Sequence, residues 1–336
     1  MPGFSKAVAR TVVFVMAFAV ARPAPGAPVE AFATSEALDN LAVSEAQTGR
    51  RQPSMADRLA VAQIQVLFDR AGISPGVIDG LDTARYRAAR AAFLKLDGGV
   101  VRLGDPASLG AALVDSGGPA FFDYEITGDD VTGPFAAVIP HLYTEQALLP
   151  ALSFVSAREM LAERFHMDEA FLAALNPDAD FATAGTRIRV ANVGKPLDRR
   201  VARIEADKGR LQLRAYARDG ALVAVYPASV GSRETPSPIG RHTVRNKAAD
   251  PFWTYDPKGS SQPGLTAGLL RLPPGPNGPV GNAWIGLSQR GYGIHGTPEP
   301  SQIGISASVG CVRLTNWDAL ELARLVSRGV VVEFIE

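Results

Sequence analysis

The chain has 336 residues, of which 46% are hydrophobic and 20% charged, as in an ordinary globular protein. Lys and Arg together number 34, as do Asp and Glu, so no global field draws the protein to nucleic acid or to an anionic membrane. The length predicts about two domains, or three small ones, and the high numbers of Gly (33) and Pro (25) favour turn-rich β structure over a helical bundle.

The N-terminus predicts export. Lys6 and Arg10 precede a short apolar run at 11–20, and A-V-A at 19–21 matches the pattern of a signal-peptidase cleavage site. The run is too short to cross a bilayer, which takes about 20 helical residues. We therefore predict a secretory signal peptide over 1–26 and a protein exported to the periplasm or cell wall, with no stable membrane span after cleavage. An uncleaved membrane anchor is the alternative.

A small helical unit is expected after a linker over 27–54. Apolar residues at helical spacing predict helices at 55–71 and 83–96, and the sequence AGISPGVIDG between them carries turn signals. This pattern over 55–97 resembles the small helical peptidoglycan-binding domains of wall-associated hydrolases. A plain helical hairpin is the alternative.

A second small unit is expected over 152–194, after a connecting segment at 98–151. Ser156, with Glu159 three residues on, has the pattern of a capping box at the start of a helix. The predicted elements are, in order, a strand at 153–155, the helix capped by Ser156, a helix at 168–175 and a strand in TRIRVAN. The order and the motif LNP…GTRIRV resemble a LysM module, a βααβ unit that binds glycan.

From residue 200 onward the pattern is that of β structure. RLQLRAY alternates apolar and polar residues, Asp219-Gly220 is a hairpin turn, and ALVAVYPASV and the terminal GVVVEFIE read as further strands. One helix is predicted at 316–328. We predict a mostly β domain over 200–336, built as a sandwich or barrel with one or two helices, after small α and α+β modules. The Pro- and Gly-rich stretch 251–279 is predicted to cover an active-site cleft.

The single cysteine, Cys311, is a candidate nucleophile. In an exported protein an unpaired cysteine is a dimer contact or a reactive thiol. A thiol nucleophile needs a base and donors for the oxyanion, and an imidazole such as that of His295 increases the thiolate fraction. Gly310 permits backbone angles that turn its own amide and that of Cys311 toward an oxyanion. A buried structural cysteine is the alternative.

Arg313 follows Cys311 by two residues. On an extended segment its side chain faces the same side as that of Cys311, where a guanidinium suits a substrate carboxylate.

The motifs H-G-T and S-x-G-C-V-R-L, in this order, resemble the L,D-transpeptidase catalytic domain. TPSPIGRHTV and GNAWIGLSQRGYGIHGT extend the likeness over 201–336. The resemblance implies that Cys311 is the nucleophile, His295 the base, Gly296 the carbonyl that orients the imidazole and Arg313 a substrate-positioning residue. It implies no metal and no organic cofactor. The further candidates for substrate binding are Tyr292, Ser308 and Trp284, with simple packing as the alternative for the two aromatic residues.

One position departs from the family pattern. The usual signature is S-H-G-C, and this chain has Val309 in place of the histidine. The resemblance implies attack of the thiolate on a peptidoglycan tetrapeptide stem and resolution of the thioester by an amine, which forms a cross-link, or by water, which makes the protein an L,D-carboxypeptidase. The expected partners are stem peptides and glycan, and not nucleic acid. Loss of the histidine leaves a silent wall-binding protein as a third reading. The acceptor and the oligomeric state are open.

Overall fold

The computed structural model describes residues 52–256 and 268–336. The predicted signal peptide, nearly all of the linker and part of the predicted covering loop lie outside these residues. The elements are, in chain order, α2 (Met55–Arg70), α3 (Ala84–Asp97), α4 (Pro106–Gly117), β1 (Phe121–Glu125), α5 (Gly128–Thr132), α6 (Tyr143–Gln146), α7 (Ala157–Arg164), α8 (Glu169–Leu175), β2 (Arg187–Ala191), β3 (Arg203–Asp207), β4 (Gln212–Tyr216), β5 (Leu222–Pro227), β6 (Gly240–Ala249), β7 (Trp253–Tyr255), β8 (Leu270–Leu272), β9 (Ala283–Leu287), β10 (Gly293–His295), η2 (Pro300–Gln302), β11 (Val312–Arg313), α9 (Asn316–Leu325) and β12 (Val331–Ile335).

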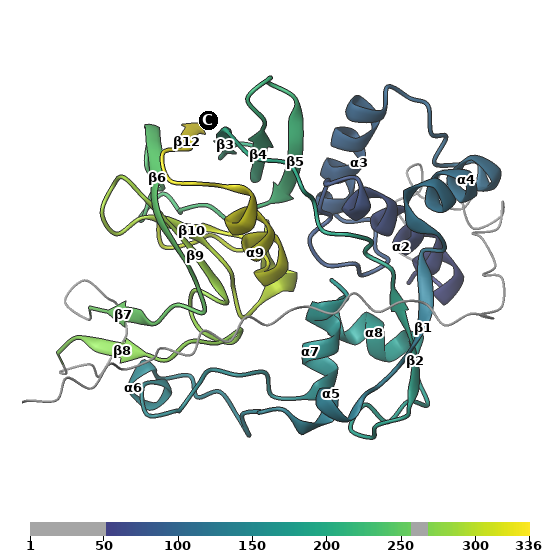
Figure 1. Cartoon of the computed structure of the whole chain (residues 1–336), viewed down its shortest axis with the longest axis horizontal. Coiled ribbons are helices and arrows are strands. Elements are labelled where there is room, and N and C mark those ends of the chain that lie inside the picture. Colours follow the sequence, from purple (N-terminus) through teal and green to yellow (C-terminus); the bar gives the residue numbers. More distant parts are fainter. Residues whose placement is uncertain (1–51, 257–267) are drawn as a thin grey trace, which may run out of the picture.

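The C-terminal part is built on an eight-stranded sheet in the order β11-β10-β9-β6-β12-β3-β4-β5. Neighbouring strands in this sheet run antiparallel except for two parallel pairs, β12 with β3 and β10 with β11. The long strand β6 pairs with β12 through its first half and with β9 through its second, and the register shifts between Val244 and Asn246. Such an irregularity bends a strand, and the sheet curls (Figure 1). The predicted mostly β fold is confirmed.

Helix α9 packs against this sheet and closes its core. Thr315 caps the helix, because its side chain accepts a hydrogen bond from the amide of Asp318 at 3.2 Å. The apolar face of α9 is buried against β6, β9 and β10. The helix therefore packs against the part of the sheet that includes β10, the strand on which His295 lies.

Both helices predicted in the first unit are confirmed as α2 and α3, with Ser54 and Thr83 as their caps. The segment 98–151, predicted as a connection, contains α4, β1, α5 and α6. In Figure 1, α2, α3 and α4 lie together on one side of the molecule, with α3 next to strand β5 of the large sheet and with α7 and α8 below α2.

The predicted strand at 153–155 is wrong. The partner of β2 is β1, whose Phe121 lies opposite Ala191, and residues 153–155 form no strand. Phe121 is buried at 3% exposure in the core, whereas Val155 of the predicted strand is 44% exposed. The capping box is also half formed, because Ser156 caps α7 while the carboxylate of Glu159 accepts from the amide of Val155 instead.

The two predicted N-terminal units share one hydrophobic core. Phe68 of α2, Phe93 of α3, Phe121 of β1 and Phe171 of α8 all belong to one buried cluster, which we call the N-terminal core. The same cluster includes Val225 of the edge strand β5. We call the part of the chain that builds it, 52–194, the N-terminal unit.

The N-terminal unit also bonds to the edge of the large sheet. The amide of Ser74 donates to the carbonyl oxygen of Val225 at 2.8 Å. The amide of Val225 in turn donates to the carbonyl oxygen of Gly72 at 2.8 Å. The backbone at 72–74 thus runs beside β5 as a short extra strand.

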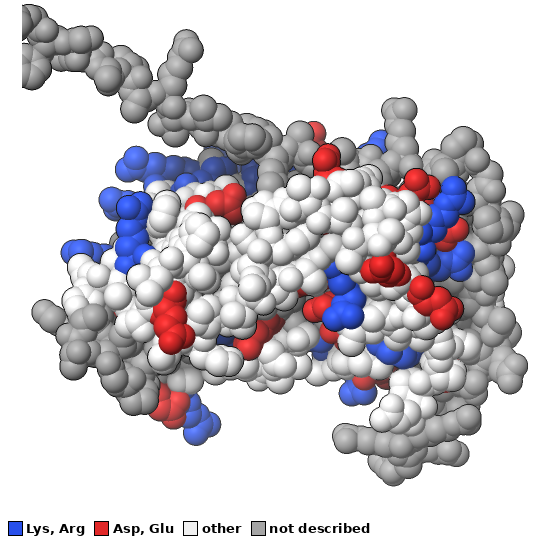
Figure 2. Space-filling model, turned by 90° about the horizontal axis from the view of Figure 1, so that it is seen from below, with Lys and Arg blue, Asp and Glu red and all other residues white. Residues whose placement is uncertain are grey.

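On the face shown in Figure 2, acidic and basic side chains are interspersed and broad areas carry no charge. Within residues 52–256 and 268–336, no helix has both the length and the apolar character needed to cross a bilayer.

Candidate active site

The two motif segments meet at the parallel pair β10–β11. Ile294 lies opposite Val312, and His295 lies opposite Arg313. Side chains alternate along extended backbone, so Cys311, two residues before Arg313, shares the face of the sheet on which His295 lies. The structure therefore brings the cysteine, the histidine and the arginine together at one edge of the sheet.

His295 is buried, at 6% exposure, and its tautomer follows from its partner. Nδ1 lies 2.7 Å from the carbonyl oxygen of Gly296, which can only accept, so Nδ1 carries the hydrogen and Nε2 keeps its lone pair. The indole of Trp284 stacks on the imidazole with ring centres 5.6 Å apart and an angle of 18°. Gly296 thus occupies the place predicted for an orienting carbonyl.

Burial lowers the pKa of His295 to about 4, an effect that Arg313 adds to and the Gly296 hydrogen bond opposes. For Cys311, burial raises the pKa of the thiol, while a backbone hydrogen bond at Gly293 and the charge of Arg313 partly offset this. Near neutral pH the site therefore holds a neutral imidazole and a neutral thiol. This combination suits general-base activation during attack, and not a preformed thiolate–imidazolium pair.

The thiol of Cys311 donates a hydrogen bond to the carbonyl oxygen of Gly291, with Sγ 3.7 Å from that oxygen. In the described part of the chain the thiol makes no direct hydrogen bond to His295. Such bonds are often long or absent in a free enzyme and form when substrate binds.

The pKa direction at Cys311 leads to a pH-dependent prediction. We expect the rate of alkylation of the folded protein by iodoacetamide to follow an apparent thiol pKa above the usual value of about 8.5. The urea-unfolded chain, whose one thiol is solvated, is the control and should titrate in the usual range. An inflection below pH 7 in the folded protein would instead reveal a preformed ion pair.

Gly310 and its neighbours shape the turn that presents Cys311. Gly310 has φ of 93°, a left-handed conformation that favours glycine, and a Cβ there would lie 2.9 Å from the ring of Tyr292. The hydroxyl of Ser308 donates to the carbonyl oxygen of Cys311. Tyr292 and Ser308 therefore contact the cysteine turn itself, and Trp284 contacts the histidine.

Arg313 is tied to the loop that precedes the cysteine. Its guanidinium donates to the carbonyl oxygen of Ala307 and lies 3.5 Å from the hydroxyl of Ser306. Its Nε is buried, and no partner for it occurs within residues 52–256 and 268–336.

A residue outside the catalytic domain also reaches this region. Tyr143 of α6 packs edge-on against Trp253 (5.5 Å between ring centres) and Tyr255 (4.8 Å) of β7; burial raises the pKa of its hydroxyl, and the charge of Arg313 opposes this. The aromatic residues of the 251–279 stretch were part of the predicted covering loop. Tyr143 belongs to no motif and carries no signal in the sequence.

Val309, at the position of the family's histidine, is 85% exposed. Its side chain points into solvent, so the difference lies outside the contacts that hold Cys311. We expect Val309→His to change the rate of Cys311 acylation by a carbapenem less than about threefold, within the small effects typical of exposed substitutions. A gain of tenfold or more, measured by intact-mass kinetics beside the wild type, would show that this position does take part.

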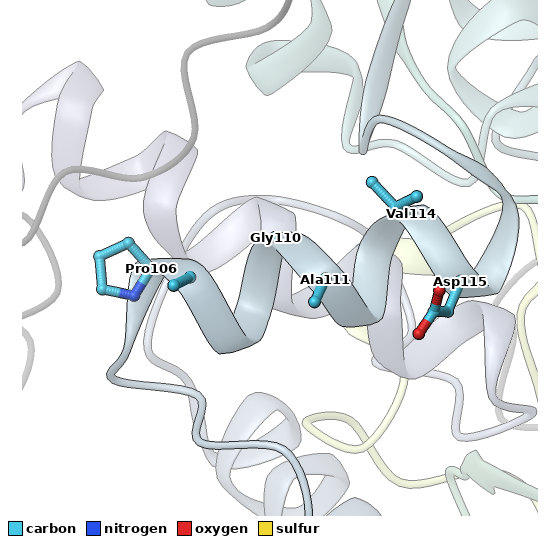
Figure 3. Close-up of a pocket in the computed structure, with 6 residues that line it drawn as sticks. Pro106, Gly110, Ala111, Val114 and Asp115 are labelled. Carbon is cyan, nitrogen blue, oxygen red and sulfur yellow. The ribbon is translucent and has the colours of Figure 1, made fainter.

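Two hollows lie elsewhere on the surface. One of about 350 Å³ follows the exposed side of α4, where Pro106, Gly110, Ala111 and Val114 present small or apolar side chains and Asp115 is the one charged residue of the lining (Figure 3). The other, a groove of about 250 Å³, lies between the α7–α8 region and the loop 298–302 that follows His295. Its lining includes Glu159, Glu163, Asp168, Glu169 and Glu299.

Comparisons with known proteins agree with the geometry. The model of the L,D-transpeptidase catalytic domain (YkuD) matches residues 201–333. The putative L,D-transpeptidase YkuD of Bacillus licheniformis is 34% identical over 176 residues, which are 52% of this chain and 90% of that protein. The probable L,D-transpeptidase YbiS of Escherichia coli K12 is 32% identical over 142 residues, 40% of this chain and 44% of that protein.

Among solved structures, L,D-transpeptidase 3 from Mycobacterium tuberculosis aligns over 46% of this chain and 76% of that one, with 19% identity and a TM-score of 0.34. The classification therefore stands on the sequence relatives: one of them is covered almost in full, and the domain model matches the part of the chain that forms the curled sheet. On this evidence the chain belongs to the L,D-transpeptidase family.

Proposed function

We propose that the protein is an exported, cysteine-dependent L,D-transpeptidase that acts on peptidoglycan stem peptides. The observation that carries the proposal is the placement of a neutral His295, with Nε2 free to accept, on the strand beside β11, which directly follows Cys311. The imidazole can take the thiol proton as the bond to carbon forms, which avoids the cost of a thiolate in a buried site.

In the first step Nε2 of His295 takes the proton from Cys311 as Sγ attacks the carbonyl carbon of the third residue of a tetrapeptide stem. The amides of Gly310 and Cys311 stabilise the oxyanion. When the tetrahedral intermediate collapses, the C–N bond breaks, His295 returns the proton to the leaving amine, and the terminal D-amino acid departs. A thioester remains on Cys311.

In the second step an acceptor amine attacks the thioester carbonyl. His295 takes a proton from that amine, a new amide bond forms, and the thiol is regenerated with the returned proton. Arg313, which lies opposite His295 on the neighbouring strand, positions a stem carboxylate during both steps. The proposed export places the enzyme in the periplasm or at the wall, where the N-terminal unit serves as a glycan-binding part.

The test is incubation of the mature protein with a purified disaccharide tetrapeptide, followed by chromatography and mass spectrometry of the products. Transpeptidation yields a cross-linked dimer and free D-amino acid. Release of the D-amino acid without a dimer indicates an L,D-carboxypeptidase that uses the same thioester. Recovery of unchanged tetrapeptide, together with failure of a carbapenem to label the proteolytic fragment that contains Cys311, would contradict both readings and favour a wall-binding protein.

A further inference from the structure

The N-terminal unit makes a polar contact with the catalytic domain next to Gly296 and Thr297, the two residues that follow His295. The side chain of Asn316, the first residue of α9, is buried at 1% exposure. Its Nδ2 lies 3.0 Å from each carboxyl oxygen of Glu163 on α7 and 3.2 Å from the carbonyl oxygen of Pro276. A side chain of the N-terminal unit therefore binds an amide in the catalytic core.

The other end of the same amide holds the backbone that follows His295. Oδ1 of Asn316 accepts from the amide of Thr297 at 3.0 Å and lies 3.4 Å from that of Asn282. Gly296 packs so closely on this oxygen that a Cβ there would lie 2.2 Å from it. The place of Gly296 is thus set by Asn316, and the carbonyl of Gly296 is the group that binds Nδ1 of His295.

Glu163 and the carbonyl of Pro276 together set which way the Asn316 amide faces. A carboxyl oxygen and a peptide carbonyl both accept, so together they require the NH2 group on the side of Glu163 and Pro276. The amide oxygen is then directed to the Thr297 amide. If the Asn316 amide were reversed, its NH2 group would face the N–H of Thr297. Both groups are donors, so neither would have an acceptor there.

The side chain of Glu163 is partly buried where it lines the 250 Å³ groove, and burial of its carboxyl group raises its pKa to about 8. Near neutral pH much of the population is therefore protonated, and the carbonyl oxygen of the acid still accepts from Asn316. A glutamine at this position offers the same acceptor, so it is the conservative replacement.

We propose that Glu163 is a positioning residue for His295: through Asn316 it fixes the carbonyl of Gly296, and so holds the imidazole in the form that leaves Nε2 as the base. The contribution comes from the N-terminal unit, outside the matched range 201–333. It makes the catalytic geometry depend on the docking of that unit. This inference rests on the proposed roles of Cys311 and His295.

The kinetic test compares Glu163→Leu, Glu163→Gln and the control Glu169→Gln in the full mature chain. Glu169 lines the same groove and pairs with Arg158 on the surface, so its variant makes the same Glu-to-Gln change in the groove without touching Asn316. We expect E163L to slow carbapenem acylation of Cys311 by about 10- to 100-fold, the cost typical of a misplaced catalytic group. E163Q and E169Q should stay close to the wild-type rate.

A spectroscopic test separates positioning from general stability. The chain has four histidines, so 15N-histidine labelling gives a spectrum simple enough to assign His295 by comparison with His295→Gln. In wild type, E163Q and E169Q the ring of His295 should carry its hydrogen on Nδ1. In folded E163L we expect a mixture with the Nε2–H form. If E163L does not fold, Glu163→Ala, which leaves room for water, is measured in its place.

Folded E163L (or E163A) with an unchanged His295 tautomer and an unchanged acylation rate would overturn the proposal, as would a rate loss accompanied only by a lower melting temperature. Failure of the wild type itself to acylate would instead contradict the proposed function. In that case the tautomer measurement still decides whether Glu163 controls the imidazole.

Discussion

Replacing Cys311 with alanine is expected to eliminate acylation, with a rate loss of up to about 10⁶-fold, the scale seen when a catalytic nucleophile is removed. The chain has no second cysteine that could substitute for it. The loss should be complete for both a carbapenem and a tetrapeptide stem, because both must form the same thioester. Intact-mass spectrometry gives the readout directly, as an adduct on the wild type and an unmodified mass on the variant.

Cys311→Ser is the matched variant, since it keeps a nucleophilic atom of similar size but replaces the thiol by a far less acidic hydroxyl. It should also lose nearly all activity while retaining the near-UV circular dichroism of the wild type. An adduct on Cys311→Ala would place the reactive group elsewhere and contradict the proposed mechanism.

Replacing His295 with glutamine is expected to slow acylation by about 10²- to 10⁴-fold near pH 7, the usual contribution of a general base. The pH dependence should change as well. The wild-type rate should be nearly constant above about pH 5, because the pKa of His295 is lowered to about 4 and the imidazole is already neutral there. The variant has no base, so its rate should follow the thiolate fraction of Cys311 and rise about tenfold per pH unit until the thiol titrates.

The measurement is acylation by a carbapenem across pH 4 to 10, followed by stopped-flow absorbance. A variant whose pH profile runs parallel to that of the wild type would show that His295 acts on structure and takes no proton. Trp284→Phe, which keeps an aromatic ring beside the imidazole, is a suitable control for the packing of the site.

The parts of the site that the sequence predicted are those that local motifs define. Cys311 and His295 each lie among glycines that permit tight turns, and the structure places their segments on adjacent parallel strands. Helices α2, α3 and α9 can likewise be predicted from the spacing of their apolar residues and from the capping residues Ser54, Thr83 and Thr315. These signals are local, so a single sequence contains them in full.

The features that escaped prediction depend on contacts between distant segments. β1 and β2 pair although they are far apart in the sequence, and the residues of neither strand indicate which segment will be its partner. Asn316 reads as a helix start, but its amide bridges Glu163 and Thr297. Tyr143 packs on Trp253 and Tyr255 because α6 lies against the β7–β8 pair. Only the assembled chain brings such groups together.

The short backbone run at 72–74 has a consequence for solubility. Strand β5 is the last strand of the large sheet, and an open edge with unpaired amides and carbonyls is a template for pairing with another chain. Gly72 and Ser74 occupy the backbone groups of Val225, and the N-terminal core covers its side chain. The N-terminal unit therefore also protects the large sheet from pairing with another chain. A fragment that begins at residue 200 would expose the backbone groups of β5 and is expected to aggregate more readily than the full chain.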